Sequence, residues 1–162
     1  MTGPGEIERL YRSHGGLVLR RARAILGNEA DAREAMQDVF AELVRAPRSL
    51  DGVRSVVGWL YRATTHRCLK VLRDRRSGAR LLRRHAAGSR PALAVAEGEL
   101  AVEARSLLAT LPDEEAAALV YHHVDGMSHA EVAELLGCSP RKVGYLIERA
   151  HGVLLQEEEG PV

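Results

Sequence analysis

The sequence predicts an all-α protein of two small helical domains joined by a flexible linker, the second a helix-turn-helix domain. Aromatic residues make up only 4% of the 162 residues, whereas Ala, Leu, Arg and Glu, which suit helices, dominate. Few segments alternate apolar with polar residues as strands do. Residues 77–98 contain Gly, Ser and Pro without a sustained period, which indicates a linker between domains at residues 1–76 and 99–156.

Composition also narrows the class of protein. The N-terminus lacks the apolar core of a signal sequence, and no run reaches the roughly 18 apolar residues of a membrane span, so a cytoplasmic protein is expected. Cys68 and Cys138 lie far apart and are expected to be reduced. His122, His123 and His129 form no i, i+4 ligand pair, so no metal is expected. With no phosphate loop or nucleophile elbow, we expect neither an enzyme nor a cofactor.

The net charge of +1 conceals three segments of different charge. Residues 1–61 have net charge +1, residues 62–96 carry ten basic residues against one acidic (+9), and residues 97–162 carry four basic against thirteen acidic (−9). A basic block indicates either a surface for a polyanion or a solvated arm, and charge alone does not choose between them.

Two helices are expected first, over residues 7–26 and from a cap at Asn28 to Pro47. The second has an apolar stripe at helical spacing. Its residues are Ala32, Ala35, Met36, Val39, Phe40 and Leu43. An acidic ridge lines another face, and by spacing alone it is most simply a solvated surface. Its residues are Asp31, Glu34, Asp38 and Glu42.

A third helix is expected over residues 56–73, and its two faces differ in chemistry. Val57, Leu60, Thr64, Cys68 and Val71 should form its buried face. The opposite face combines a tryptophan with cations: Trp59, Arg62, His66, Lys70 and Arg73. A ring for base stacking among phosphate-binding cations suits single-stranded nucleic acid. The alternative, which spacing leaves equally open, is that Trp59 packs onto a neighbouring helix and the cations are only solvated.

The C-terminal segments have the local signals of a helix-turn-helix. Helices are expected over residues 99–112 and 113–124, followed by a turn at Asp125-Gly126. Ser128 and Glu131 fit a capping box, and Gly137 suits a left-handed stop. Ser139 and Pro140 then begin a last helix. Its apolar face is Val143, Leu146, Ile147, Ala150 and Leu154, and its outer face is Arg141, Lys142, Tyr145, Glu148 and Arg149. The pattern predicts a DNA-reading helix, although αα-hairpins without a DNA role are common.

Four stretches together resemble the extracytoplasmic-function (ECF) sigma factors of bacterial RNA polymerase. They are "ADAREAMQDVFAELVRAP", "VGWLYRATTHRCLKVLRDRR", "LATLPDEEAAALVYHHVDGMSHAEVAELLGCSPRKVGYLIERA" and the linker between them. The resemblance covers nearly the whole chain. The family's Asp-Ala-x-x-x-x-Gln-Glu-x-Phe signature matches from Asp31 to Phe40, with Asp38 for the usual Glu, and its Trp-Leu-Tyr-Arg run matches from Trp59 to Arg62.

The resemblance implies partners and a role for each surface. The first domain would bind the clamp helices of the polymerase largest subunit and open promoter DNA at the minus-ten element, and the second would read the minus-thirty-five element and rest on the polymerase flap. Polymerase contacts would be Asp31, Glu34, Gln37 and Asp38. Minus-ten contacts would be Trp59, Arg62, His66, Lys70 and Arg73. Minus-thirty-five contacts would be Ser139, Arg141, Lys142, Tyr145 and Arg149. The family often has an anti-sigma partner.

Some positions depart from the family pattern and leave an alternative function open. His66 and Lys70 stand where Asn and Asp are common, and Gly144, which costs about 1 kcal/mol against Ala in a helix, lies within an altered last helix. Promoter sequence is therefore not predicted. The alternative is a helix-turn-helix regulator or sigma-like adaptor that binds DNA or polymerase without initiating transcription.

Overall fold

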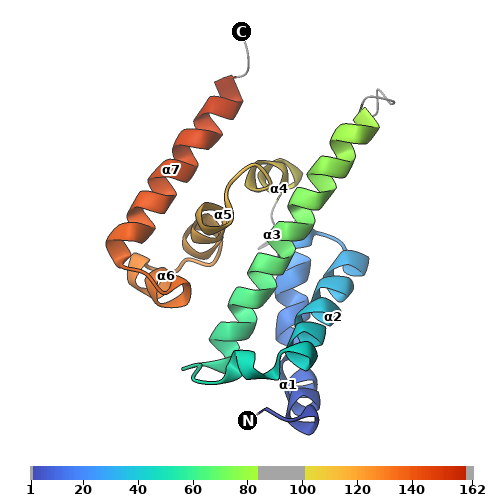
Figure 1. The fold of residues 1–162 in the computed structure, drawn as a ribbon. Coiled ribbons are helices and arrows are strands. Elements are labelled where there is room, and N and C mark those ends of the chain that lie inside the picture. The colour runs from blue at the N-terminus through green and yellow to red at the C-terminus, as the bar shows by residue number, and fades with distance from the viewer. Residues whose placement is uncertain (1, 84–100, 160–162) are drawn as a thin grey trace.

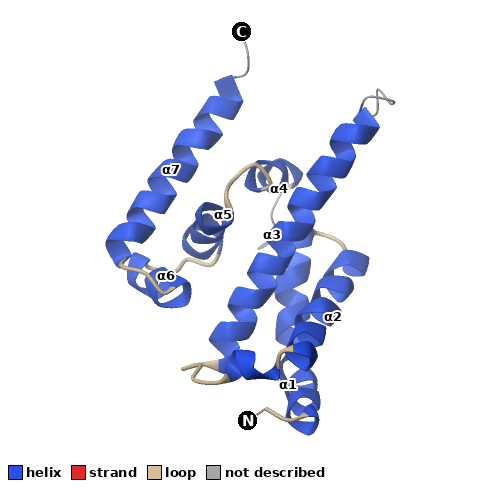
Figure 2. Ribbon diagram, viewed as in Figure 1, coloured by secondary structure: helices blue, strands red, loops and turns tan. Residues whose placement is uncertain are grey.

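A long helix, α3 (Val56–Arg83), runs through the middle of the molecule, with the helices that precede it in the chain on one side and those that follow it on the other (Figure 1). The computed structural model describes residues 2–83 and 101–159. We call residues 2–83 the first region and residues 101–159 the second region. No strand occurs in either of them, as Figure 2 shows by colour, so the all-α prediction is confirmed.

The first region is a bundle of α1 (Pro4–Leu26), α2 (Glu29–Arg45) and α3 (Val56–Arg83), with a 3₁₀ turn at Pro47–Leu50. Gly27 ends α1 at φ 74°, and the Asn28 side chain accepts the Asp31 N–H at the start of α2, as expected. All six residues of the α2 stripe are buried. A lower core joins α1, α2 and α3 through Ile7, Val18, Met36, Val39, Phe40, Leu43 and Leu60.

The third helix corrects two sequence expectations. It continues to Arg83 rather than ending at residue 73, so residues 77–83 of the predicted linker are helical. The rest of that linker, residues 84–98, lies outside the described residues. Leu60, Thr64 and Cys68 are buried as expected, but Val57 is 44% exposed. The residues of this part of α3 that contact the lower core are Val56, Trp59 and Leu60, so Val57 lies on another face of the helix. The domain boundaries themselves stay a prediction.

The second region contains α4 (Val102–Leu108), α5 (Asp113–Leu119), α6 (His129–Leu136) and α7 (Pro140–Glu159). The expected capping box of Ser128 and Glu131 is present, and Gly137 adopts φ 67° at the end of α6. The expected helix over residues 113–124 instead changes at Val120 into a π-turn that runs to Val124, in which the Asp125 N–H bonds to the Val120 carbonyl.

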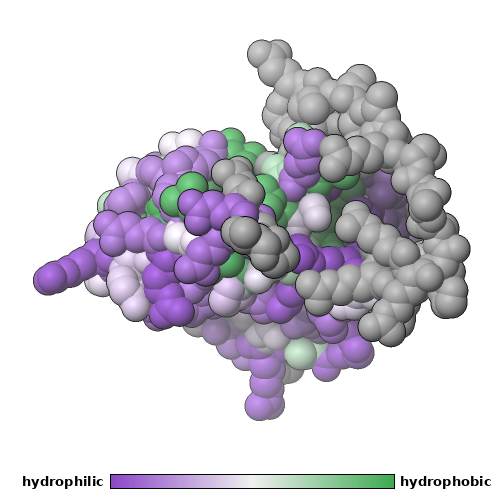
Figure 3. All heavy atoms as spheres, turned by 90° about the horizontal axis from the view of Figure 1, so that it is seen from above, coloured by the Kyte–Doolittle hydropathy of each residue, from purple (hydrophilic) through white to green (hydrophobic). Residues whose placement is uncertain are grey.

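Besides the lower core of the first region, a larger hydrophobic core is shared by the two regions. Ile25 and Leu26 of α1 and Leu69 and Leu72 of α3 belong to the same buried cluster as the apolar residues of the second region. That cluster includes Leu108, Leu111, Leu119, Val120, Tyr121, Val132, Val143, Leu146, Ile147 and Ala150. Seen from above, hydrophilic residues cover most of the visible described surface around a smaller hydrophobic area (Figure 3). The packing of the two regions against each other therefore fixes the position of the α3 surface relative to the α7 surface.

Candidate nucleic-acid interface

An open groove of about 450 Å³ runs along α3 and brings together all five residues predicted to contact the minus-ten strand. Its lining residues are Glu42, Trp59, Arg62, Ala63, His66, Arg67, Lys70, Arg73 and Asp113. Four of the five predicted residues are cationic or titratable to a cation, and the fifth is the tryptophan. Helical spacing of three and four residues places them on one face. The groove thus combines an aromatic surface with positive charge.

Trp59 packs onto a neighbouring core, as one alternative expected, and it also remains open to the groove. The side chain is partly buried and packs against the lower core, and it also lines the groove. The start of α3 is fixed beside it, because the Ser55 hydroxyl accepts the Gly58 N–H at 3.0 Å. A ring supported from behind and open to a groove is a rigid stacking surface.

His66 lies among cations on the floor of the groove. Burial lowers its pKa, and the nearby Arg62 lowers it further, against the opposing influence of Asp113 and Glu114. Its Nε2 atom is buried without a hydrogen-bond partner. The ring is therefore held in its neutral form more strongly than an exposed histidine, and a bound phosphate would favour its protonation.

Some residues on the predicted polymerase-binding face of α2 form ion pairs with α3, and others are exposed to solvent. Asp31 forms an ion pair with Arg75, and Asp38 forms one with Arg67, both from α3. Glu34 and Gln37 are exposed. The two aspartates therefore hold α3 against α2, whatever else they contact.

The outer face of α7 lies in solvent as the sequence predicted. Ser139 caps the helix by accepting the Lys142 N–H at 3.1 Å. Arg141, Lys142 and Arg149 are exposed, and Tyr145 is 56% exposed. The apolar face, Val143, Leu146, Ile147 and Ala150, is buried, with Leu154 partly so. This is the arrangement that a helix needs in order to enter a DNA groove.

Carboxylates of α5 bind two of these exposed cations. Lys142 Nζ lies 3.6 Å from Glu114 Oε2, and Arg149 Nε lies 3.2 Å from Glu115 Oε1. Arg149 also donates to the Tyr145 hydroxyl at 3.3 Å. Glu115 is only 5% exposed, so its pairing with Arg149 is needed to satisfy a buried carboxylate.

Four histidine rings lie together beside the helix-turn-helix. His122 is 4.9 Å from His123 and 4.8 Å from His129 between ring centroids, and His123 is 5.3 Å from His151. Burial and the neighbouring imidazoles lower the pKa of His123. Within residues 2–83 and 101–159, no three His, Cys, Asp or Glu side chains converge as metal ligands do. Cys68 lies in the core, where burial raises its pKa to about 12.

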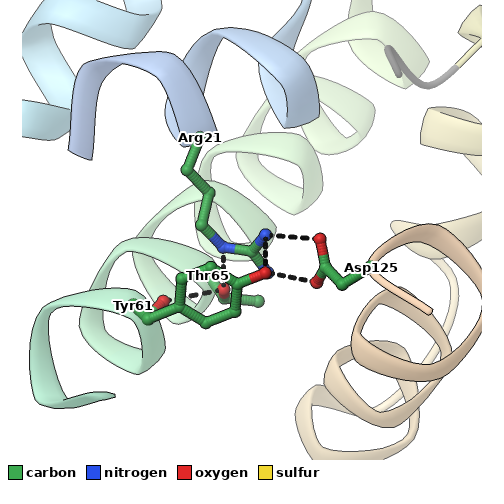
Figure 4. A network of polar contacts seen from close by, with 4 residues as sticks. All are labelled: Arg21, Tyr61, Thr65 and Asp125. Carbon is green, nitrogen blue, oxygen red and sulfur yellow. Dashed lines mark hydrogen bonds and ion pairs between the residues drawn. The ribbon is translucent and has the colours of Figure 1, made fainter. Parts of the chain in front are cut away.

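Sequence patterns missed a polar network that joins the two regions (Figure 4). Arg21 of α1 donates to both carboxylate oxygens of Asp125, at 2.8 and 2.9 Å, and to Tyr61 and Thr65 of α3. Tyr61 in turn stacks on Tyr121, with ring centroids 5.7 Å apart. Burial raises the pKa of both tyrosines, which keeps their hydroxyls protonated. No local spacing signals such contacts, since their members are 40 to 104 residues apart.

Comparison with known protein families gives a separate match for each of the two regions. Residues 10–78 match the family described as Sigma-70 region 2, and residues 101–150 match Sigma-70, region 4. These two ranges contain the groove on α3 and the helix-turn-helix, respectively. No helix within the described ranges is both long and apolar enough for a bilayer.

Relatives and solved structures lead to the same family. The chain is 29% identical over 151 residues to the ECF RNA polymerase sigma factor SigE of Mycolicibacterium smegmatis, covering 89% of this chain but only 57% of SigE. It is 30% identical over 149 residues to ECF sigma factor SigM of Mycobacterium tuberculosis, covering 91% of this chain and 74% of SigM.

Two solved structures share the fold across both regions. Sigma factor RpoE of Bartonella quintana, in complex with the anti-sigma factor NepR, has a TM-score of 0.53 at 14% identity and covers 97% of this chain and 99% of its own. CnrH, in complex with the cytosolic domain of CnrY, has a TM-score of 0.52 at 23% identity and covers 97% and 90%. Together with the matches to both sigma-70 regions, these similarities show that the chain belongs to the ECF family of RNA polymerase sigma factors.

Proposed function

We propose that this protein directs RNA polymerase core to specific promoters and initiates transcription there. The observation that carries the proposal is the pairing of two surfaces within one chain. A groove with Trp59 and four cationic or titratable side chains lies in the part similar to region 2. An exposed, capped helix lies in the part similar to region 4. An adaptor or a simple regulator would not need both.

The groove is proposed to hold the opened minus-ten strand. Trp59 would stack on a base, and Arg62, Lys70 and Arg73 would hold phosphates, with His66 available as a further cation on protonation. The support is that all of these side chains line one groove. Arg67, which lines the same groove, is bound to Asp38 and is given a structural role.

The polymerase contact is proposed for the face of α2 that carries Asp31, Glu34, Gln37 and Asp38. Exposed Glu34 and Gln37 would contact the clamp helices directly. Because Asp31 and Asp38 are paired with α3, their contribution would be shared with Arg75 and Arg67. The second region would rest on the polymerase flap.

The outer face of α7 is proposed to read the minus-thirty-five element through Arg141, Lys142, Tyr145 and Arg149, with Ser139 at the helix start. Helix N-terminal residues are the ones that approach base edges in this motif. Arg141 is exposed and forms no ion pair within the described regions, so it is the freest of the four to reach DNA.

Two further assignments follow from the proposed role. Because transcription takes place on chromosomal DNA, we place the protein in the cytoplasm and give it a binding role with no catalysis of its own. An anti-sigma factor is a proposed partner, because RpoE of Bartonella quintana, which shares this fold, is bound to the anti-sigma factor NepR.

In vitro transcription with purified core polymerase tests the function. Added protein should produce promoter-specific transcripts that core alone does not make. Transcripts absent at every promoter, despite tight binding to core or DNA, would favour the adaptor or regulator.

Substitution of the tryptophan tests the groove. Trp59→Leu should keep core packing but remove base stacking worth about 1–3 kcal/mol, so permanganate reactivity of unpaired thymines should fall. Trp59→Phe keeps an aromatic ring and should restore most of it. Equal reactivity in all three proteins would exclude Trp59 from strand binding.

A further inference from the structure

Arg149 of α7 is held by two neighbouring side chains, and one of them is a buried carboxylate. The Arg149 Nε atom lies 3.2 Å from Oε1 of Glu115, which belongs to α5. Its Nη1 atom donates to the Tyr145 hydroxyl at 3.3 Å, and its Cζ atom lies 5.6 Å from the centroid of the Tyr145 ring. Two of the three guanidinium nitrogens are therefore engaged, and within the described residues Nη2 is left for another partner.

The carboxylate of Glu115 is a firmer anchor than the other carboxylate beside α7. Its side chain is only 7% exposed, and a buried carboxylate needs its cation. The neighbouring pair of Glu114 and Lys142 is longer, at 3.6 Å, and both of its side chains are at least half exposed. Because an exposed pair of this kind contributes little, it does not hold Lys142 in one place.

The helix backbone beneath Arg149 is fixed as well. Leu146 and Ala150 of α7 are buried in the same core as Ala116, which follows Glu115 in α5. The arginine and its anchor therefore stand on two helices that pack against each other. A long side chain loses conformational entropy when it is immobilised, so contacts that hold Arg149 before DNA arrives reduce the cost of ordering it on binding.

A carboxylate beside a DNA-binding arginine has two opposite effects on binding. It cancels part of the positive charge, which weakens attraction to phosphates whatever the base sequence. It also fixes the direction of the free Nη2 group, which favours one contact to a base edge over the many phosphate contacts open to a mobile arginine. Affinity for unrelated sequences should therefore fall, while discrimination between sequences should rise.

We propose that Glu115 is a positioning residue: without touching DNA, it holds Arg149 in the orientation that reads one base pair of the minus-thirty-five element. This inference rests on the proposed function, because it assumes that α7 reads that element. Loss of Glu115 should raise affinity for unrelated DNA and lower the preference for the correct base. A residue that only stabilised the fold would lower both.

Substitutions at three positions separate positioning from charge. Glu115→Leu removes the charge and the acceptor oxygen, and it fills the buried site with an apolar side chain. Glu115→Gln removes the charge but keeps an oxygen beside the Arg149 Nε–H. Arg149→Lys keeps the charge but loses the planar fork. Glu114→Gln, in the exposed pair one position away, is the matched control for a change of one charge.

The assay uses holoenzyme assembled from core polymerase and each full-length protein, with a pool of DNA duplexes whose central segment is randomised. Sequencing of the bound duplexes gives the base preference at each position. Arg149→Lys should reduce the preference at one position by at least about fivefold, the discrimination of one good contact to a base. Glu115→Leu should reduce it several-fold at that same position, and Glu115→Gln should retain most of it. In the Arg149→Lys background, Glu115→Leu should cause no further loss.

Affinity for a duplex of scrambled sequence gives the opposite sign. The three variants that remove a carboxylate, Glu115→Leu, Glu115→Gln and Glu114→Gln, should each bind this duplex more tightly than wild type. Glu114→Gln should keep the wild-type base preference at the position that Arg149 reads. The gain on scrambled DNA thus reports charge, and the loss of base preference reports positioning.

The orientation of Arg149 is measured separately in the free full-length protein. NMR relaxation of its Nε–H group reports motion on the ps–ns timescale. The order parameter of this group should be high in wild type and in Glu115→Gln, and low in Glu115→Leu. If thermal unfolding shows that Glu115→Leu does not fold, Glu115→Met supplies a more adaptable apolar side chain for the same test.

Two results in the selection would overturn the inference. One is an unchanged preference at the Arg149 position in the folded apolar variant, and the other is an equal loss in Glu115→Gln, which would assign the effect to charge. A mobile Arg149 in the free wild-type protein would also refute it, and would leave the proposed function intact. If wild-type holoenzyme enriches no sequence from the pool, the proposed function fails and the inference fails with it.

Discussion

Replacing Gly144 by alanine should stabilise the protein without changing DNA recognition. A Cβ at this position would lie 3.7 Å from Cε1 and Nδ1 of the His129 ring, which is ordinary van der Waals contact. The backbone has no positive φ there, so alanine brings no strain. Because glycine costs about 0.5–1 kcal/mol against alanine within a helix, the free energy of unfolding should rise by about that amount.

Thermal unfolding followed by circular dichroism measures this effect. For a protein of this size, 1 kcal/mol corresponds to about 2–4 °C in Tm. Gly27→Ala is the opposite control: Gly27 has φ 74°, and a Cβ there would clash with the Arg105 guanidinium, so its Tm should fall. The new methyl group of Gly144→Ala would face α6 rather than solvent, so promoter binding by the holoenzyme should be unchanged. A lower Tm, or weaker promoter binding at a raised Tm, would refute this account of Gly144.

Further substitutions test charges at the proposed surfaces. Glu34→Arg should weaken core binding in a pull-down at unchanged Tm, whereas Asp38→Arg should also lower Tm because it repels its arginine partner on α3. Arg149→Ala should lower the free energy of unfolding measured in urea, because it leaves Glu115 buried and unpaired, and Glu115→Gln should recover most of that loss. Because the pKa of His66 is lowered in the folded state, stability should fall as pH drops below about 6.5, and His66→Gln should reduce that fall.

Local chemistry explains which parts of the fold the sequence predicts well. The Ser128–Glu131 box, the Gly137 stop and the Ser139 cap each depend on residues within a few positions of one another, so their signals survive in the sequence. Local signals do not predict the end of α3. Ser77 and Gly78 indicate a break, yet α3 continues past them, and Arg76 just before them donates to the Ser106 carbonyl at 3.0 Å.

In the candidate site, too, local spacing predicts some features and misses others. Helical spacing was enough to place the groove residues on one face of α3, because that face belongs to one helix. Spacing could not show that Arg67 and Arg75 bind aspartates of α2, or that Arg73 binds Asp113. Several arginines of the basic block therefore have a role that neither interpretation of its charge predicted, because they join helices to one another.

The acidic charge of the second region has two consequences. Three of its carboxylates bind arginines of the first region: Asp125 with Arg21, Asp113 with Arg73, and Glu157 with Arg76. The whole second region carries eleven acidic against four basic residues, a net charge of −7. Since that charge repels a duplex at range, the outer face of α7 should bind DNA weakly by itself. It should therefore depend on polymerase to hold it beside the promoter at high effective concentration.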